Sequence, residues 1–142
     1  MNRKHTSELL AELKEDGSFE QYVKRNEEEF EEQEFCEYLR ELCTSLGKVP
    51  EQVIKNSQID RTYGHQLFSG RRKPSRDKVL LLSFGMELPF EETQELLRVS
   101  GKNTLYPKIK RDAAIIYGKN KGLTVLEMQE LLFSLDLPIL GE

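Results

Sequence analysis

Apolar side chains recur at helical spacing from residue 35 onward. Four of them lie at positions i, i+4, i+7 and i+11, namely Phe35, Leu39, Leu42 and Leu46. Such a stripe lies on one face of a helix, and a glycine directly after it, here Gly47, is typical of a helix end. Because no stretch alternates apolar and polar residues over the length of a strand, the pattern predicts an all-α protein.

Two helices joined by a tight turn follow. Pro50 can begin a helix without a backbone N–H, and Ile54 lies on the buried face of that short helix. Asp60 is a good N-cap for the next helix, which Gly70 ends. Ile59 is an apolar plug in the turn. The predicted segments are a helix over 50–57, a turn at 58–59 and a helix over 61–69.

Two more helices complete a predicted five-helix bundle. Ser75 can cap the first of them, and Pro89 opens the second. Their buried faces consist of aliphatic and aromatic residues, which are Val79, Leu80, Leu81, Leu82, Phe90, Leu96 and Leu97. Residues 35–101 are therefore expected to form one helical domain.

Residues 1–34 are expected to form a separate acidic segment. A leucine stripe before Gly17 predicts one short helix, and Ser18 with Gln21 forms a capping box for a second. Glutamates then occupy positions 27, 28, 29, 31, 32 and 34. This run has four interpretations: a solvated helix surface, a segment that repels DNA, a docking site for a basic partner, or an autoinhibitor of a basic loop.

The chain contains an internal repeat with a period of 35 residues. Residues 75–97 align without a gap with residues 110–132, and eight of the 23 positions are identical. Thr124 and Glu127 form a capping box in the second copy. Each copy is predicted to be a helical hairpin that buries the same faces.

The second copy extends the predicted bundle by one hairpin. Two copies are too few for a free solenoid, so residues 102–142 are expected to pack on the preceding domain. The apolar tail over residues 137–140 has two interpretations. It either packs as a terminal segment or contributes to a partner or dimer surface.

The charge is distributed unevenly, although the formal net charge is -4. Residues 1–47 carry 13 acidic and 6 basic side chains, whereas residues 48–82 carry 8 basic and 3 acidic ones. Six cations lie within eighteen residues, namely Arg61, Arg71, Arg72, Lys73, Arg76 and Lys78. If they share a face, they can neutralise several phosphates, which indicates double-stranded DNA as the partner. The alternative is a solvated basic loop.

The stretch from Val53 to Ser75 resembles the Cro/phage-repressor type of helix-turn-helix proteins, often called the Xre family. Two helices joined by a short turn are followed by a glycine, basic residues and a Pro-Ser that caps the next helix, as in that family. The resemblance covers about residues 35–97. It implies that the helix over 61–69 is the recognition helix and lies in the major groove.

The family pattern places three side chains of this sequence toward base edges, which are Arg61, Thr62 and Gln66. Arginine can bridge guanine O6 and N7, glutamine can pair with adenine, and threonine can bind through its hydroxyl or its methyl group. The resemblance assigns the DNA backbone to six others, which are Tyr63, His65, Arg71, Arg72, Lys73 and Arg76. For Tyr63 and His65, packing or a surface position is the alternative.

Gly64 departs from the family pattern, which has an aliphatic residue at that place. Glycine inside a helix costs about 1 kcal/mol, so a bulky neighbour is expected to fill the space. The candidates are Tyr63 and Leu67. Pro50 likewise occupies a place where the family often has a glutamine that binds a phosphate, with Gln52 nearby.

Other site chemistry is not predicted. Cys36 and Cys43 lie seven residues apart on a helix, about 10 Å at 1.5 Å per residue, which is too far for a disulfide. Neither His5 nor His65 has the spacing to complete a metal site with them, so no metal and no cofactor are expected. No phosphate loop or nucleophile–base arrangement points to an enzyme.

The sequence predicts a cytoplasmic, sequence-specific transcriptional regulator of the Xre type that binds double-stranded DNA. No apolar run approaches the roughly 20 residues that a membrane span needs, so no membrane partner is expected. As in its look-alikes, the protein is expected to act as a homodimer on half-sites one helical turn apart. The alternative function is a protein-interaction module, such as an antitoxin or adaptor. That module would hold a partner through the acidic N-terminal segment or the C-terminal hairpin.

Overall fold

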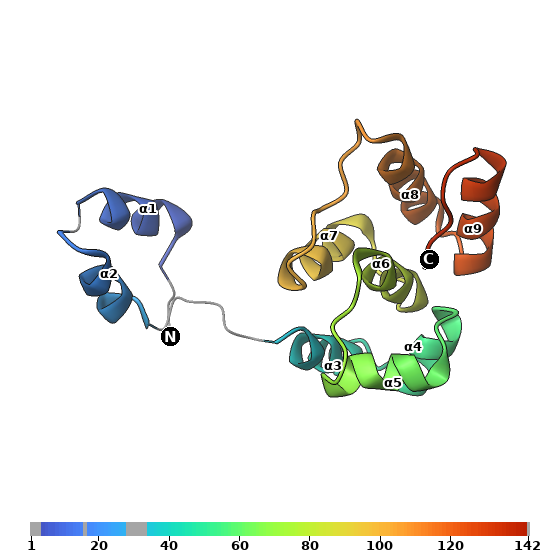
Figure 1. Ribbon diagram of the computed structural model, residues 1–142, viewed down its shortest axis with the longest axis horizontal. Coiled ribbons are helices and arrows are strands. Elements are labelled where there is room, and N and C mark those ends of the chain that lie inside the picture. The colour runs from blue at the N-terminus through green and yellow to red at the C-terminus, as the bar shows by residue number, and fades with distance from the viewer. Residues whose placement is uncertain (1–3, 16, 28–33, 142) are drawn as a thin grey trace. The chain divides into compact units, whose positions relative to one another are not determined.

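The computed structural model describes residues 4–15, 17–27 and 34–141. Within these ranges the chain forms nine α-helices and no strands, which confirms the all-α prediction (Figure 1). The chain divides into two compact units, one covering residues 1–33 and the other residues 34–142.

The first unit contains α1 (Thr6–Glu15) and α2 (Phe19–Arg25). Ser18 caps α2 by accepting a hydrogen bond from the Gln21 backbone at 3.2 Å, which is one of the two bonds of the capping box predicted there. Lys4 joins the two helices, because its Nζ lies 2.9 Å from Glu12 and 2.7 Å from the Asn26 side chain. Most of the predicted acidic run, residues 28–33, lies outside the described residues.

The second unit begins with α3 (Phe35–Ser45), α4 (Pro50–Asn56) and α5 (Arg61–Ser69). The bounds of α4 and α5 match the predicted short helix and recognition helix within a residue. Asp60 caps α5 through the Tyr63 backbone N–H, and Gly70 ends α5 with φ +86°. In the turn, Gln58 has φ +59° and Ile59 is buried, so the apolar plug is present.

Gly64 allows α5 to lie directly against α4. A Cβ at this position would lie 2.4 Å from Ile54 Cγ2, which is too close for any side chain. The space beside Gly64 is therefore filled by Ile54. The expectation that Tyr63 or Leu67 fills it is wrong, because the neighbour comes from the facing helix rather than from α5 itself.

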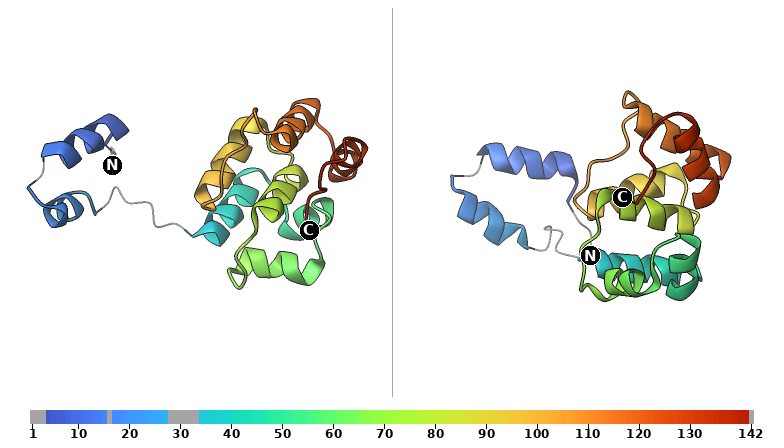
Figure 2. Two further views of the ribbon diagram at one scale, coloured as in Figure 1. Left: turned by 45° about the horizontal axis from the view of Figure 1, so that its top comes forward. Right: turned by 45° about the vertical axis from the view of Figure 1, so that its right-hand side comes forward.

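Helix α6 (Arg76–Gly85) is the centre of the second unit, and α7 (Phe90–Val99) follows it. Every residue of α6 from Val79 to Gly85 is buried. A helix that is apolar on all sides has to be surrounded, and α6 contacts α4, α7 and α9. All three views show it between α3–α5 and the C-terminal helices (Figures 1 and 2). Gly85 allows the closest approach, since a Cβ there would lie 1.9 Å from Ser57 Oγ.

The repeated hairpin consists of α8 (Lys110–Lys121) and α9 (Val125–Ser134), joined by a turn at Gly122. The predicted capping box of Thr124 and Glu127 is present. The apolar tail packs against the unit, because Leu140 is buried and exchanges two backbone hydrogen bonds with the Gln129 amide. The equivalent residues of the first copy, Gln94 and Leu105, form the same two bonds.

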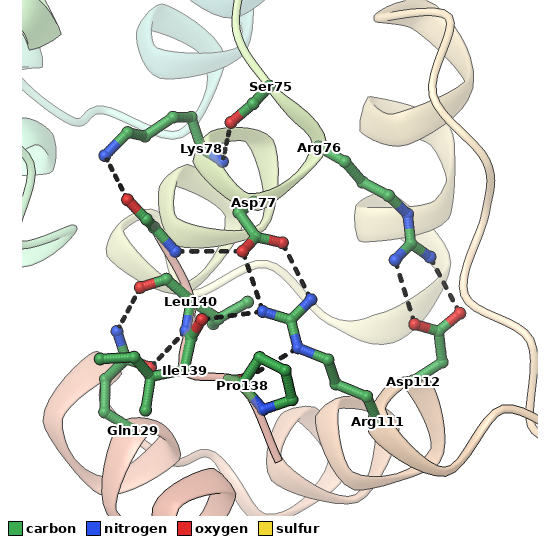
Figure 3. Close-up of polar contacts among 11 residues, drawn as sticks. Ser75, Arg76, Asp77, Lys78, Arg111, Asp112, Gln129, Pro138, Ile139 and Leu140 are labelled. Atoms are coloured by element: carbon green, nitrogen blue, oxygen red, sulfur yellow. Dashed lines mark hydrogen bonds and ion pairs between the residues drawn. The ribbon is translucent and has the colours of Figure 1, made fainter.

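The two copies of the repeat bind each other through two matching ion pairs (Figure 3). Arg76 binds Asp112 through both terminal nitrogens, at 3.0 and 2.9 Å. Arg111, which is equivalent to Arg76, binds Asp77 at 3.0 and 2.8 Å. Each arginine also donates to two backbone carbonyls of its own copy, at residues 103 and 104 or 138 and 139.

This exchange of partners defines the symmetry of the repeat. In a translational repeat, Arg76 would bind the second copy and Arg111 would bind a third copy. Here Arg111 binds back to the first copy, so a pseudo-twofold axis relates the hairpins, as in an isologous dimer. The helix contacts agree, because α6 packs on α9 and α7 packs on α8.

Lys119 lies close to this axis and faces Phe84, the residue at its own position in the other copy. The ammonium group lies 4.0 Å from the Phe84 ring centroid and 3.2 Å from the Leu88 carbonyl oxygen. Only 9% of Lys119 is exposed. Burial lowers the pKa of Lys119 to about 7, because a desolvated ammonium group is costly.

We expect the ion pair of Arg76 and Asp112 to contribute strongly to stability, and the effects of removing its two partners to be coupled. Asp112 is 2% exposed, so Asp112→Ala should lower the free energy of unfolding by about 3 kcal/mol, because it leaves the Arg76 charge without its carboxylate. Arg76→Ala should cost a similar amount, and the double variant should cost clearly less than the sum. Urea unfolding measures all three. The exposed pair of Glu95 and Arg98 is the control, since Glu95→Ala should cost less than about 1 kcal/mol. Strict additivity at Arg76 and Asp112 would contradict this expectation.

Lys119 should make stability rise with pH above neutrality. The folded pKa of about 7 is below the ordinary 10.5, so the penalty for the buried charge is complete below pH 7 and decreases as pH rises. Lys119→Met removes the penalty. The stability gained by this variant should shrink by about 1.4 kcal/mol per pH unit between pH 7.5 and 9.5. Urea unfolding at several pH values tests this, and a gain independent of pH would show that Lys119 is not neutral in the folded protein.

A candidate nucleic-acid interface on helix α5

The N-terminal half of α5 exposes the side chains that the sequence assigns to base edges. The Arg61 side chain is 77% exposed, and Thr62 is exposed beside it. Gln66 lies one turn further along and is half-buried. The opposite face of α5 is fixed to the core by Leu67 and Phe68. The polar side of the helix is thus held rigidly at the surface.

Glu51, in the first turn of α4, binds two of the exposed α5 side chains. Its Oε1 accepts a hydrogen bond from Arg61 Nε at 2.7 Å, and its Oε2 lies 2.5 Å from His65 Nε2. The hydrogen bonds from Arg61 and His65 lower the pKa of Glu51, and the same pairing raises the pKa of Arg61. The carboxylate is therefore ionised at neutral pH.

The basic loop after α5 folds back onto the helix. Arg72 Nε donates to Gln66 Oε1 at 2.7 Å, and its guanidinium carbon lies 5.1 Å from the Tyr63 ring centroid. Lys78, from α6, places its ammonium 5.3 Å from the same ring. Tyr63 thus holds two cations beside α5, an arrangement that cation–π attraction favours.

Arg71, Arg72 and Lys73 are all exposed. The loop that carries them is fixed at both ends, because Gly70 caps α5 and Ser75 caps α6 by accepting from the Lys78 backbone N–H. Pro74 between them is buried. Arg61 and these three cations are the exposed arginine and lysine side chains of α5 and of the loop that follows it, and we call this set the α5 surface.

Arg76 is not part of the α5 surface. Its guanidinium group binds Asp112 and two backbone carbonyls, which uses its Nε and both terminal nitrogens. The sequence could not separate Arg76 from its basic neighbours, because the partner lies 36 residues away. The structure thus uses Arg76 to hold the second hairpin.

Two side chains near α5 were not singled out from the sequence. Glu51 contacts Arg61 and His65 directly, and Arg40 from α3 donates to the Phe68 carbonyl at the end of α5. Lys78 was expected among the cations, but its contact with Tyr63 was not. Glu51 follows Pro50 in a helix start, where an acidic residue is ordinary, so its sequence position gave no signal. The available clue was that Arg61 and His65 are four residues apart and therefore lie on the same face of α5.

The described ranges contain no metal site and no disulfide. No three side chains of the kinds that ligate metals gather there, and both cysteines are buried, unbridged thiols. No helix in these ranges is long and apolar enough to cross a membrane.

No family model matches the chain, and neither does any curated protein or solved structure. The function is therefore inferred from the geometry of the site.

Proposed function

We propose that this protein is a sequence-specific DNA-binding regulator of the helix-turn-helix type, with α5 as its recognition helix. The observation that carries the proposal is the α5 surface itself. Arg61 and Thr62 lie exposed on a helix whose other face is buried, and three exposed cations follow in the loop directly after that helix.

The division of labour on this surface follows from general recognition chemistry. Arg61 and Gln66 have the functional groups that read guanine and adenine in the major groove, and Thr62 can contact thymine. The exposed loop cations, with Tyr63 and His65 beside them, suit phosphates, which position a protein without reading sequence. The net charge of -4 does not oppose this proposal, because residues 48–82, which include α5 and its loop, carry 8 basic and 3 acidic side chains.

A homodimer remains part of the proposal, with one restriction. The face of α6 that carries Arg76 and Asp77 is covered by the second hairpin of the same chain. A second copy therefore has to bind through another surface. Half-sites one helical turn apart are the expected spacing for a dimer.

The test is fluorescence anisotropy with duplexes enriched from a random library, compared with a scrambled duplex at two salt concentrations. Wild-type protein should prefer the enriched duplex, and its affinity should fall steeply with salt. Arg61→Ala/Gln66→Ala should reduce the preference by at least about 30-fold, since each of the two bidentate base contacts contributes about 1–3 kcal/mol.

Lys110→Ala is the control, because it removes one positive charge from an exposed position on α8. It should leave the preference unchanged. Weak binding that ignores sequence, salt and the double substitution would contradict the proposal and favour a protein-interaction role.

A second candidate function is a protein-interaction module, such as an antitoxin or adaptor, and a specific observation favours it. Leu126 and Phe133 lie two turns apart on α9 and are 64% and 78% exposed. The equivalent residues on α7 are Glu91 and Arg98. The second copy thus has apolar residues at two exposed positions where the first copy has charged ones, which is typical of a contact surface.

Leu126→Glu/Phe133→Arg tests this candidate, because it gives α9 the surface residues of α7. Affinity capture from an extract of the source cells, quantified by mass spectrometry, should recover a protein with wild type that the variant does not retain. Ser134→Ala on the same helix is the control. Identical recovery by all three proteins would count against a partner on α9.

A further inference from the structure

Glu51 is an acidic residue directly beside Arg61 of the α5 surface. Its carboxylate bridges Arg61, at the start of α5, and His65, one turn later, through separate oxygens. Glu51 belongs to α4, so this bridge also joins the two helices of the helix-turn-helix pair. The side chain is 52% exposed and therefore accessible to a ligand on the same face.

The hydrogen bond to Glu51 determines which nitrogen atoms of Arg61 remain available to a ligand. The Nε atom of Arg61 donates to Glu51, whereas its two terminal nitrogens have no hydrogen bond to any residue that the structure describes. Those two nitrogens are the fork with which an arginine can bind guanine O6 and N7 side by side. A long arginine side chain loses rotamer freedom on binding, and a carboxylate that holds it beforehand reduces that loss.

The same carboxylate opposes binding to the DNA backbone. It is ionised at neutral pH because the hydrogen bonds from Arg61 and His65 lower its pKa. A negative charge on this face repels phosphates and offsets one of the nearby cations. Sequence-independent binding therefore becomes weaker, while the base contact of Arg61 becomes better defined.

We propose that Glu51 is a positioning residue that sets the sequence preference of the α5 surface, holding Arg61 for a guanine and weakening non-specific attachment. This inference rests on the proposed DNA-binding function. It does not require that Glu51 contact DNA.

Glu51→Gln is the informative substitution, because it keeps the shape of the side chain and removes its charge. The ratio of affinities for the enriched and scrambled duplexes should fall about 10-fold, as one well-oriented bidentate contact is weakened. Affinity for the scrambled duplex should rise at the same time. Library selection with the variant should show a relaxed preference at a single base pair, the one that Arg61 reads.

Two controls separate positioning from a simple change in charge. Glu87→Gln makes the same charge change at an exposed residue paired with Lys48, 3.7 Å away, and should keep the ratio of affinities. In an Arg61→Ala background, Glu51→Gln should no longer change the ratio, because the side chain that it positions is absent.

The outcomes are distinguishable. If Glu51→Gln raises affinity for both duplexes equally, Glu51 acts only through its charge and the inference is overturned, while the DNA-binding proposal stands. If wild-type protein enriches no sequence at all, the proposed function fails and the inference fails with it. A lower ratio together with a relaxed single position supports both.

Discussion

The burial of every residue of α6 from Val79 to Gly85 is the constraint on which the second unit depends. A ten-residue helix with buried side chains on every face needs partners all around it, and the chain supplies α4 on one side with α7 and α9 on others. The position of α4 against α6 is fixed by the close approach of Gly85 to Ser57, and the position of α5 against α4 by Gly64 and Ile54. Helix α5, the proposed recognition helix, is therefore held in place by its packing on α4 and by the packing of α4 on α6.

Local features of the fold were predictable from the sequence because they depend on neighbouring residues. Asp60, Ser75 and Thr124 cap helices where expected, and Gly70 ends α5. Long-range pairing was not predictable in this way. The identity of Ile54 as the neighbour of Gly64 depends on the relative position of two helices, which no local pattern specifies.

The same distinction applies to the candidate site. Arg61 and Arg76 look alike in the sequence, since both are basic residues near a helix start. In the structure Arg61 pairs with an exposed glutamate, whereas Arg76 is bound to Asp112 and serves the packing of the repeat. The repeat did contain the necessary information, because both Arg and Asp recur together at the same offset. What it did not reveal was that each arginine would bind the aspartate of the other copy.

The reciprocal pairing of the two hairpins also limits how this architecture can grow. The arginine and the aspartate of each copy are both paired with the other copy, so neither hairpin has these two side chains available to bind a further copy. An array related by translation can be lengthened by adding units, whereas a closed twofold arrangement is finished at two. Further duplication of this segment would add a hairpin with no matching face to dock on. The assembly is self-limiting.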